Sequence, residues 1–436
     1  GVLFLLSSID SCAASARGGG LFMDSGNNGM MIGNSSILNC SAAYGGGLLS
    51  VSTTIFGVNY STIAYNNATY YGGGVALTED NVGTLFLEDS FHHNSAGTLG
   101  GALFTGPTGD TLVVAGSTFT HNTAGKNGGA MFVESGNLNF LVTDSASFSE
   151  SFWIETEHPY RYVEGVTIFN RTISAPGVVE YMMHCGLDSA FAPQDKITIY
   201  NGAGAVVLEA FGGDPLPGIE LPSLRIQGDS FTVIVTGFAD ALTPATSYQD
   251  DIYGLRLYIT PVIPNPAIPT RFFHNTAGLR GGGLYMFGGI EFAKILSSEF
   301  MYNTASTGGG ALYIRNAMTG IIVQSVVFVE NSSPVQGGAV ILSSSTYGAE
   351  FKNVTFVNNT AGELGGAVSM NTNNGFEGAF TDGNEIVFEG CVMTHNSAEL
   401  GGAAFLDNSN AIVLRDSYLA HNTASRNGGG VFMKTS

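Results

Sequence analysis

Residues 91–104 read FHHNSAGTLGGALF, and the pattern of this stretch recurs through most of the chain. Glycine pairs or triplets begin at Gly18, Gly45, Gly72, Gly100, Gly128, Gly281, Gly308, Gly337, Gly365, Gly401 and Gly428. Most neighbours in this series lie 27 to 29 residues apart, an Asn precedes most of them by five or six residues, and a Phe often stands three residues before that Asn. Three landmarks in one phase establish an internal repeat.

A repeat of this length, rich in β-branched, aromatic and Gly residues and without helical periodicity, is typical of one coil of a parallel β-helix. We therefore predict an all-β fold, a right-handed single-stranded parallel β-helix of about eleven coils. Coils stack about 4.8 Å apart, so equivalent residues align in columns.

Two columns are expected to lie inside the β-helix. An aromatic stack is predicted for Phe91, Phe119, Phe272, Phe300, Phe328 and Phe356. A ladder of amides at a tight inner bend, each bonded to its neighbours, is predicted for Asn94, Asn122, Asn275, Asn303, Asn331, Asn359, Asn396 and Asn422. The same landmark assigns Asn39 and Asn66 to this ladder.

The repeat is interrupted once. Phe148 and Phe272 occupy the same phase, so the insertion adds 124 residues (272 − 148), and the Gly rhythm stops within it. The single Trp153 lies here, and alternating runs at 196–200 and 231–235 indicate half-buried strands. The predicted domains are a first β-helix part at 1–148, an inserted β-sandwich at 149–269 and a second β-helix part at 270–436.

Composition excludes several classes of function. A net charge of −20 repels phosphate backbones, so nucleic acid is not an expected partner. Apolar residues are too abundant, and charges too few, for a disordered chain. No apolar run is long enough for a transmembrane segment. We expect an extracellular or cell-surface location.

The motifs resemble a known family. Gly100-Gly101-Ala102-Leu103 and Gly309-Gly310-Ala311-Leu312, together with Phe91-His92-His93-Asn94 and Phe300-Met301-Tyr302-Asn303, are similar to the repeats of chlamydial polymorphic outer membrane protein passengers. The resemblance covers about 1–148 and 270–436. It implies a right-handed β-helix exposed on a surface, often with an adhesive role.

The insertion resembles a CUB-type β-sandwich at residues 155–160, 195–202, 226–231 and 251–254, and at Cys185. This resemblance implies an extracellular binding module, many of which hold Ca²⁺ through carboxylates. Glu180, Asp195 and Asp251 are the candidate calcium ligands, and the alternative is that they are ordinary solvated carboxylates. No other cofactor is expected.

Two further patterns have a chemical and a structural interpretation. His93, His121, His274, His395 and His421 each precede a ladder Asn and should point outward, either as metal ligands or, as we favour, as polar bend residues. Asp89, Asp144 and Asp416 recur before the Phe column, as the carboxylates of a polysaccharide-active enzyme would. Ser or Thr replaces them elsewhere and no basic residue accompanies them, so we predict no enzyme.

Covalent modifications are predicted from local motifs. Asn59, Asn67, Asn170, Asn353 and Asn358 are the expected glycosylation sites, whereas the sequons at Asn39 and Asn331 fall in the predicted inner ladder. Cys12 and Cys40 lie 28 residues apart, about one coil, and such spacing allows a coil-to-coil disulfide.

The predicted function is that of a non-catalytic structural or adhesive extracellular glycoprotein, a segment of a cell-surface or filament-forming β-helix. Its expected partners are other copies, by head-to-tail or lateral assembly, or further β-helix of the same chain, and glycans. The alternatives are a glycan- or protein-binding module acting through the CUB-like insertion, and a pectate-lyase-like enzyme.

Overall fold

The computed structural model describes residues 3–25, 28–79, 81–107, 112–134, 140–148, 152–155, 167–174, 180–185, 196–211, 224–228, 230–236, 256–290, 293–316, 318–343, 346–371, 385–407 and 412–434. Within these ranges the secondary structure is β-strand, and no helix is long and apolar enough to cross a membrane. The chain divides into two compact units, residues 1–145 with 268–436, and residues 146–267.

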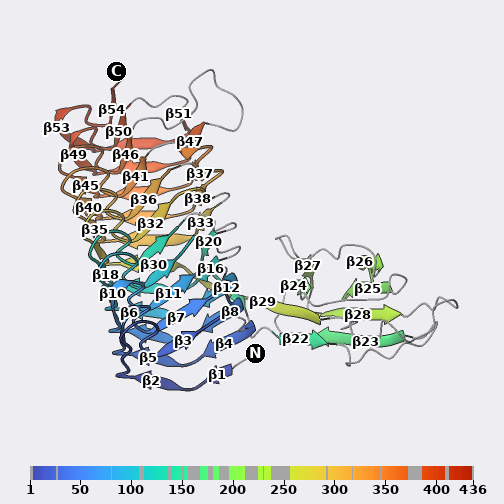
Figure 1. Ribbon diagram of the computed structural model, residues 1–436. Helices are drawn as coiled ribbons and strands as arrows, with labels where there is room; N and C mark the ends of the chain where they lie inside the picture. The colour runs from blue at the N-terminus through green and yellow to red at the C-terminus, as the bar shows by residue number, and fades with distance from the viewer. Residues whose placement is uncertain are drawn as a thin grey trace. The chain divides into compact units, whose positions relative to one another are not determined.

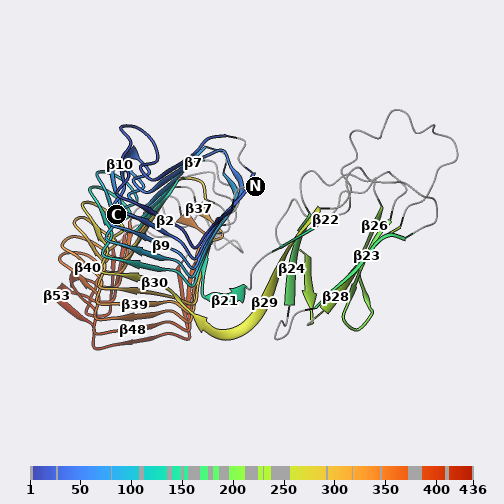
Figure 2. The ribbon, with the colours of Figure 1, turned by 90° about the horizontal axis from the view of Figure 1, so that it is seen from below.

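The first unit is a right-handed parallel β-helix whose coils contribute strands to four parallel sheets, named A to D here (Figure 1). Sheet A contains β1 (Leu3–Leu5), β4 (Asn28–Gly33), β8 (Thr54–Asn59), β12 (Val82–Leu87), β16 (Leu112–Ala115), β20 (Phe140–Thr143), β33 (Lys294–Leu296), β38 (Ile322–Gln324), β43 (Glu350–Lys352), β47 (Ile386–Glu389) and β51 (Ile412–Arg415). Sheet B contains β2 (Ser8–Asp10), β5 (Ser36–Leu38), β9 (Thr62–Ala64), β13 (Ser90–His92), β17 (Thr118–Thr120), β30 (Thr270–Phe273), β34 (Ser298–Met301), β39 (Val327–Val329), β44 (Thr355–Val357), β48 (Val392–Thr394) and β52 (Tyr418–Ala420). Figure 2 shows strands of sheet B stacked in chain order.

The other two sheets complete each coil. Sheet C contains β6 (Ser41–Tyr44), β10 (Asn67–Tyr71), β14 (Ser95–Ala96), β18 (Thr123–Ala124), β31 (Thr276–Ala277), β35 (Thr304–Ala305), β40 (Ser332–Ser333), β45 (Thr360–Ala361), β49 (Ser397–Leu400) and β53 (Thr423–Asn427). Sheet D contains β3 (Leu21–Met23), β7 (Leu48–Val51), β11 (Val75–Thr78), β15 (Leu103–Thr105), β19 (Met131–Val133), β32 (Leu284–Phe287), β36 (Leu312–Arg315), β41 (Val340–Ser343), β46 (Val368–Asn371), β50 (Ala404–Asp407) and β54 (Val431–Lys434). A short pair, β37 (Met318–Thr319) and β42 (Thr346–Tyr347), lies between sheets D and A in the sequence.

The Phe column fills the interior behind sheet B. In β13 and β17 the central Phe91 and Phe119 are fully buried between two partly exposed neighbours, as the alternation of a strand requires. Successive rings from Phe91 to Phe356 stack with centroids 4.4–5.0 Å apart. Burying each ring contributes about 2–3 kcal/mol, so this column is a major source of stability.

The Asn ladder lies at the bend between sheets B and C, called the B–C bend here. Asn303 Nδ2 donates to Phe272 O (2.8 Å) and to Asn331 Oδ1 (3.0 Å). Its own Oδ1 accepts from the backbone N–H (3.1 Å) and Nδ2 (3.0 Å) of Asn275. This pattern repeats from Asn66 to Asn422, so buried polar groups are satisfied coil after coil.

Asn39 does not belong to the ladder, so its predicted position is wrong. Cys40 occupies the inner site, where its backbone N–H donates to Asn66 Oδ1 (2.9 Å), while Asn39 is exposed. The reason is a shorter coil, because Ala68 pairs with Ala42 but Tyr71 pairs with Tyr44, leaving one residue less in β6 than in β10.

The second unit contains two antiparallel sheets. The first joins β21 (Ser145–Phe148), β22 (Phe152–Glu155), β24 (Glu180–Cys185), β27 (Leu224–Gln227) and β29 (Arg256–Ile268). The second joins β23 (Thr167–Ser174), β25 (Lys196–Asn201), β26 (Val206–Phe211) and β28 (Ser230–Thr236). The buried rings of Tyr181 and Phe231 bring the two sheets into contact, with centroids 4.8 Å apart.

The insertion interrupts one coil at the bend between sheets A and B, called the A–B bend here. The chain leaves the β-helix after Ser145 and returns at Ile268, whose backbone N–H donates to Ser145 Oγ (3.2 Å). The coils on either side keep their register, since Phe119 pairs with Phe272 across the interruption.

Candidate functional site

The outer side of the B–C bend carries a row of rings that we call the ring column, namely Tyr65, His93, His121, His274 and Tyr302. Each residue directly precedes a ladder Asn and adopts a left-handed backbone conformation, with φ between 51° and 58°. Such a φ is uncommon outside Gly, and it reverses the chain so that the Asn points inward while the ring points outward.

The rings of this column stack along the β-helix. Centroid distances are 4.9 Å for Tyr65–His93, 5.0 Å for His93–His121, 5.1 Å for His121–His274 and 4.8 Å for His274–Tyr302. All five side chains are exposed. Glu330 and Asn358 occupy the next two positions of the bend, and His395 and His421 then form a second, shorter stack at 5.0 Å.

Hydroxyl and apolar side chains flank the ring column. On the sheet C side, Ser95, Thr123, Thr276 and Thr304 lie in register, and the hydroxyls of Thr276 and Thr304 are 3.2 Å apart. On the sheet B side the partly exposed residues are His92, Thr120, Phe273 and Met301. Burial lowers the pKa of His92, and the neighbouring His93 and His121 lower it further.

The histidines are not arranged as a metal centre. Among the described residues, no group of three or more His, Cys, Asp or Glu side chains is placed to hold a metal ion. Stacked imidazoles present their edges side by side, so their nitrogens do not converge on one point. The ring column can instead offer hydrogen-bonding edges and apolar contact at an interval of about 5 Å.

The three predicted calcium ligands belong to the insertion. Asp195 and Asp251 lie outside the described residues, and Glu180 is the first residue of β24.

Four predicted glycosylation sites are accessible. Asn67, Asn170, Asn353 and Asn358 are exposed, whereas Asn331 lies fully buried in the ladder. Asn59 is the least accessible of the five, because it is only 9% exposed and its Oδ1 is buried.

Cys12 and Cys40 stack on neighbouring coils at the start of the Asn ladder, because the flanking Ala13 and Ser41 are in register. Both are free thiols in the structure, and they donate to Asp10 O (3.4 Å) and Leu38 O (3.0 Å) respectively. Burial raises the pKa of the Cys40 thiol.

A second inner ladder, which the sequence analysis missed, lies at the A–B bend. Its small polar members include Ser35, Ser61, Asp89 and Ser117, with Ser61 N–H donating to Asp89 Oδ1 (2.8 Å) and Asp89 N–H donating to Ser117 Oγ (3.1 Å). The sequence feature that could have predicted this ladder is a Ser that recurs two residues before the position of the Phe column.

The three aspartates considered for catalysis do not come together. Asp89 is buried inside the β-helix, where burial holds its pKa well above the ordinary value. Asp416 is exposed at the preceding, left-handed position of the A–B bend in a distant coil, and Asp144 is partly exposed.

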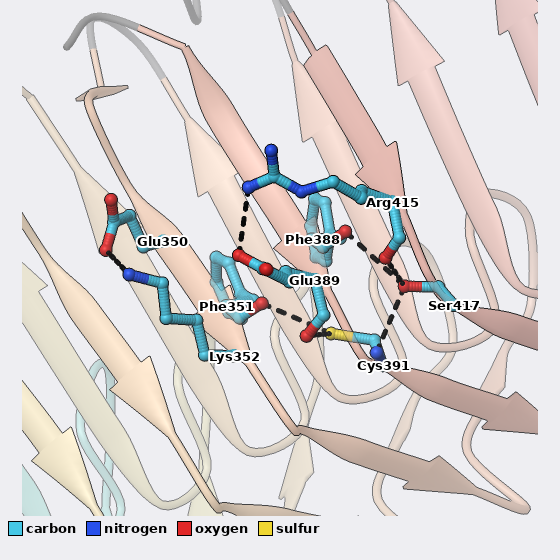
Figure 3. Close-up of polar contacts among 8 residues, drawn as sticks. All are labelled: Glu350, Phe351, Lys352, Phe388, Glu389, Cys391, Arg415 and Ser417. Atoms are coloured by element: carbon cyan, nitrogen blue, oxygen red, sulfur yellow. Dashed lines mark hydrogen bonds and ion pairs between the residues drawn. The ribbon is translucent and has the colours of Figure 1, made fainter.

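Figure 3 shows the A–B bend near the last coils. Cys391 lies in the inner ladder of this bend. Its backbone N–H donates to Ser417 Oγ (3.0 Å), and its thiol donates to Phe351 O (3.3 Å). Burial raises the pKa of this thiol. On the outer face of sheet A, Arg415 pairs with Glu389 (3.0 Å) on the adjacent coil.

Comparison with known families agrees with this repeat architecture. Residues 353–370, which contain Phe356-Val357-Asn358-Asn359 and Gly365-Gly366-Ala367-Val368, match the Chlamydia polymorphic membrane protein repeat. The Phe-x-x-Asn and Gly-Gly landmarks of this matched stretch recur on other coils of the β-helix. The match spans one repeat out of the series, and no curated protein matches the chain.

Proposed function

We propose that this chain is a non-catalytic, surface-displayed structural and adhesive β-helix, and that the ring column is its contact surface. The observation that carries the proposal is five exposed rings stacked on consecutive coils. The type of repeat supports display on a cell surface, because its name is that of a membrane protein family.

The Asn ladder behind the ring column supports this role. Every ring is followed by an Asn whose amide is bonded to the coils on both sides, so the column is held before any partner arrives. A preorganised surface avoids much of the ordering entropy that binding otherwise costs. Tyr, which occupies both ends of the column, is also over-represented among the residues that dominate binding energy.

Glycans and self-association are part of the same proposal. Asn67 lies on the flank of the ring column, in register with Ser95, and Asn358 lies in line with it. Glycans there would border the contact surface. Lateral or head-to-tail association of copies is proposed as the way in which such β-helices assemble into larger structures.

The test is adhesion of beads coated with purified chain to cultured epithelial cells. The ring variant carries His93→Gly, His121→Gly and Tyr302→Gly, and the matched control carries Glu330→Gly, all at left-handed positions of one bend that Gly tolerates. We expect the ring variant to lose adhesion at least about tenfold and the control to retain it. Equal adhesion of the two variants would contradict the proposal, and adhesion lost only on deleting residues 146–267 would assign it to the CUB-like insertion.

A further inference from the structure

Sheet D carries a second aromatic column, on its outer face and independent of the ring column. Phe104, Phe132, Tyr285 and Tyr313 lie in register on four consecutive coils, with centroids 5.6, 5.1 and 5.2 Å apart. They are only 2–6% exposed, so they form a core of their own outside the β-helix interior.

Two arginines are held against the tyrosines of this column. The Arg280 guanidinium carbon lies 5.5 Å from the centroid of the Tyr313 ring, one coil further on. Burial raises the pKa of the Tyr285 hydroxyl, and the nearby Arg315, at the end of β36 on the next coil, lowers it. One guanidinium from each of the two coils therefore lies near the stacked rings of Tyr285 and Tyr313.

These arginines differ from four other basic residues of the β-helix. Arg271, Lys352, Arg415 and Arg426 each pair with a Glu, at 2.5–3.0 Å. No ion pair among the described residues includes Arg280 or Arg315, although acidic residues outnumber basic ones 35 to 15.

Arg315 also carries a donor without an acceptor. Its Nε atom is buried and has no hydrogen-bond partner among the described residues. An unsatisfied buried donor costs about 1–3 kcal/mol, and the cost is larger for a charged group. An oxygen atom of an incoming ligand would remove this cost.

We propose that Arg280, Tyr285, Tyr313 and Arg315 form a binding site for an oxyanion of a glycan, a carboxylate or a sulfate group. The planar fork of a guanidinium matches the two oxygens of such a group, and aromatic contact fixes the fork in place before binding. The two arginines supply local positive charge on a chain of net charge −20, so binding weakens as salt concentration rises.

The experiment measures binding of the full chain to three fluorescent oligosaccharides of equal length, one carboxylated, one sulfated and one neutral. We expect binding of the carboxylated or the sulfated probe and no binding of the neutral one, and the preferred probe identifies the group. Arg280→Gln and Arg315→Gln should each weaken this binding at least about tenfold. Arg415→Gln, which removes a surface arginine already paired with Glu389, is the matched control and should bind as the wild type does.

Arg315→Lys keeps the charge but lacks the fork, and we expect it also to weaken binding. Thermal unfolding of every variant is recorded alongside, and Arg280→Gln provides the test if Arg315 variants unfold. The proposal is overturned if neither charged probe binds, if the neutral probe binds equally well, or if Arg280→Gln and Arg415→Gln bind alike.

Discussion

Asn303 shows how a single amide supports three coils, because its side chain contacts Phe272 O, Asn331 Oδ1 and the backbone of Asn275. In Asn303→Asp an oxygen replaces the donating nitrogen and faces two acceptors in a dry interior. We expect the free energy of unfolding to fall by about 3 kcal/mol or more, measured by urea denaturation.

The matched control is Asn358→Asp, at an exposed position with φ 55°. We expect this substitution to change the free energy of unfolding by less than about 0.5 kcal/mol. Equal losses in the two variants would show that the ladder amides contribute no more than surface amides do.

Asp89 predicts a pH dependence of stability. Burial raises the pKa of this carboxyl well above its ordinary value in the folded chain, so the folded state binds more protons than the unfolded state. The stability that the neutral carboxyl contributes is complete below the unfolded pKa, about 3.9, and is lost as pH rises through the folded pKa.

Asp89→Ser, which gives the residue of the neighbouring Ser61 and Ser117, removes this titration. We expect the variant to gain stability relative to the wild type as pH rises from about 4 toward neutrality. Unfolding free energies of both proteins at a series of pH values provide the measurement, with the exposed Asp416→Ser as control. A constant difference between Asp89→Ser and wild type across that window would show that Asp89 does not titrate there.

The positions of individual residues could be predicted from the sequence where the length of the repeat is constant. Phe-x-x-Asn spacing placed Phe300 and Asn303 correctly, because both recur at 28-residue intervals. Asn39 was misplaced by a one-residue change in coil length, which the Gly count does not reveal. The cluster of Arg280 and Arg315 could not be predicted from the repeat. Each arginine occurs on one coil only, and the two coils are different.

At the scale of elements, the glycine bend between sheets C and D limits how closely coils approach. A Cβ built on Gly310 would lie 2.2 Å from Gly338 O and 2.6 Å from the backbone N and O of Ser332. These are backbone atoms of the next coil, which cannot move without separating the coils. The Gly-Gly-Ala motif is therefore a requirement of stacking.

We accordingly expect Gly310→Ala to destabilise the chain by about 3 kcal/mol or more, because the overpacked atoms are backbone. Gly289→Ala is the matched control, since a Cβ there meets nothing within 4 Å. Thermal unfolding should distinguish the two variants clearly. An unchanged melting temperature for Gly310→Ala would mean that neighbouring coils are less tightly stacked than described.

The sequence predicted the sheets less completely than the coils. The period and the alternation around Phe91 identified sheet B, and the glycines located the bend before sheet D. Sheet C was not foreseen, because strands such as β14 and β18 contain two residues and carry no alternation. The inner ladder at the A–B bend was missed because Ser, Asp and Cys share one position in it.

At the scale of the whole molecule, the insertion is connected through one bend of an otherwise continuous β-helix. Because Ile268 N–H bonds Ser145 Oγ, the two ends of residues 146–267 lie next to each other. We expect a chain in which a Gly-Gly linker replaces residues 146–267 to fold and to retain the β-helix, as judged by circular dichroism and a cooperative thermal transition. A chain that fails to fold after this deletion would show that the β-helix depends on the insertion.

Site-specific photo-crosslinking shows whether the ring column contacts the partner surface. A photoreactive phenylalanine analogue is placed at Tyr302, within the column, or at Tyr418, a 60% exposed residue of sheet B outside it, and the chain is bound to cells before irradiation. We expect strong cross-links to cell-surface material from position 302 and few from position 418. Cross-links of equal yield from the two positions, or from position 418 alone, would contradict it.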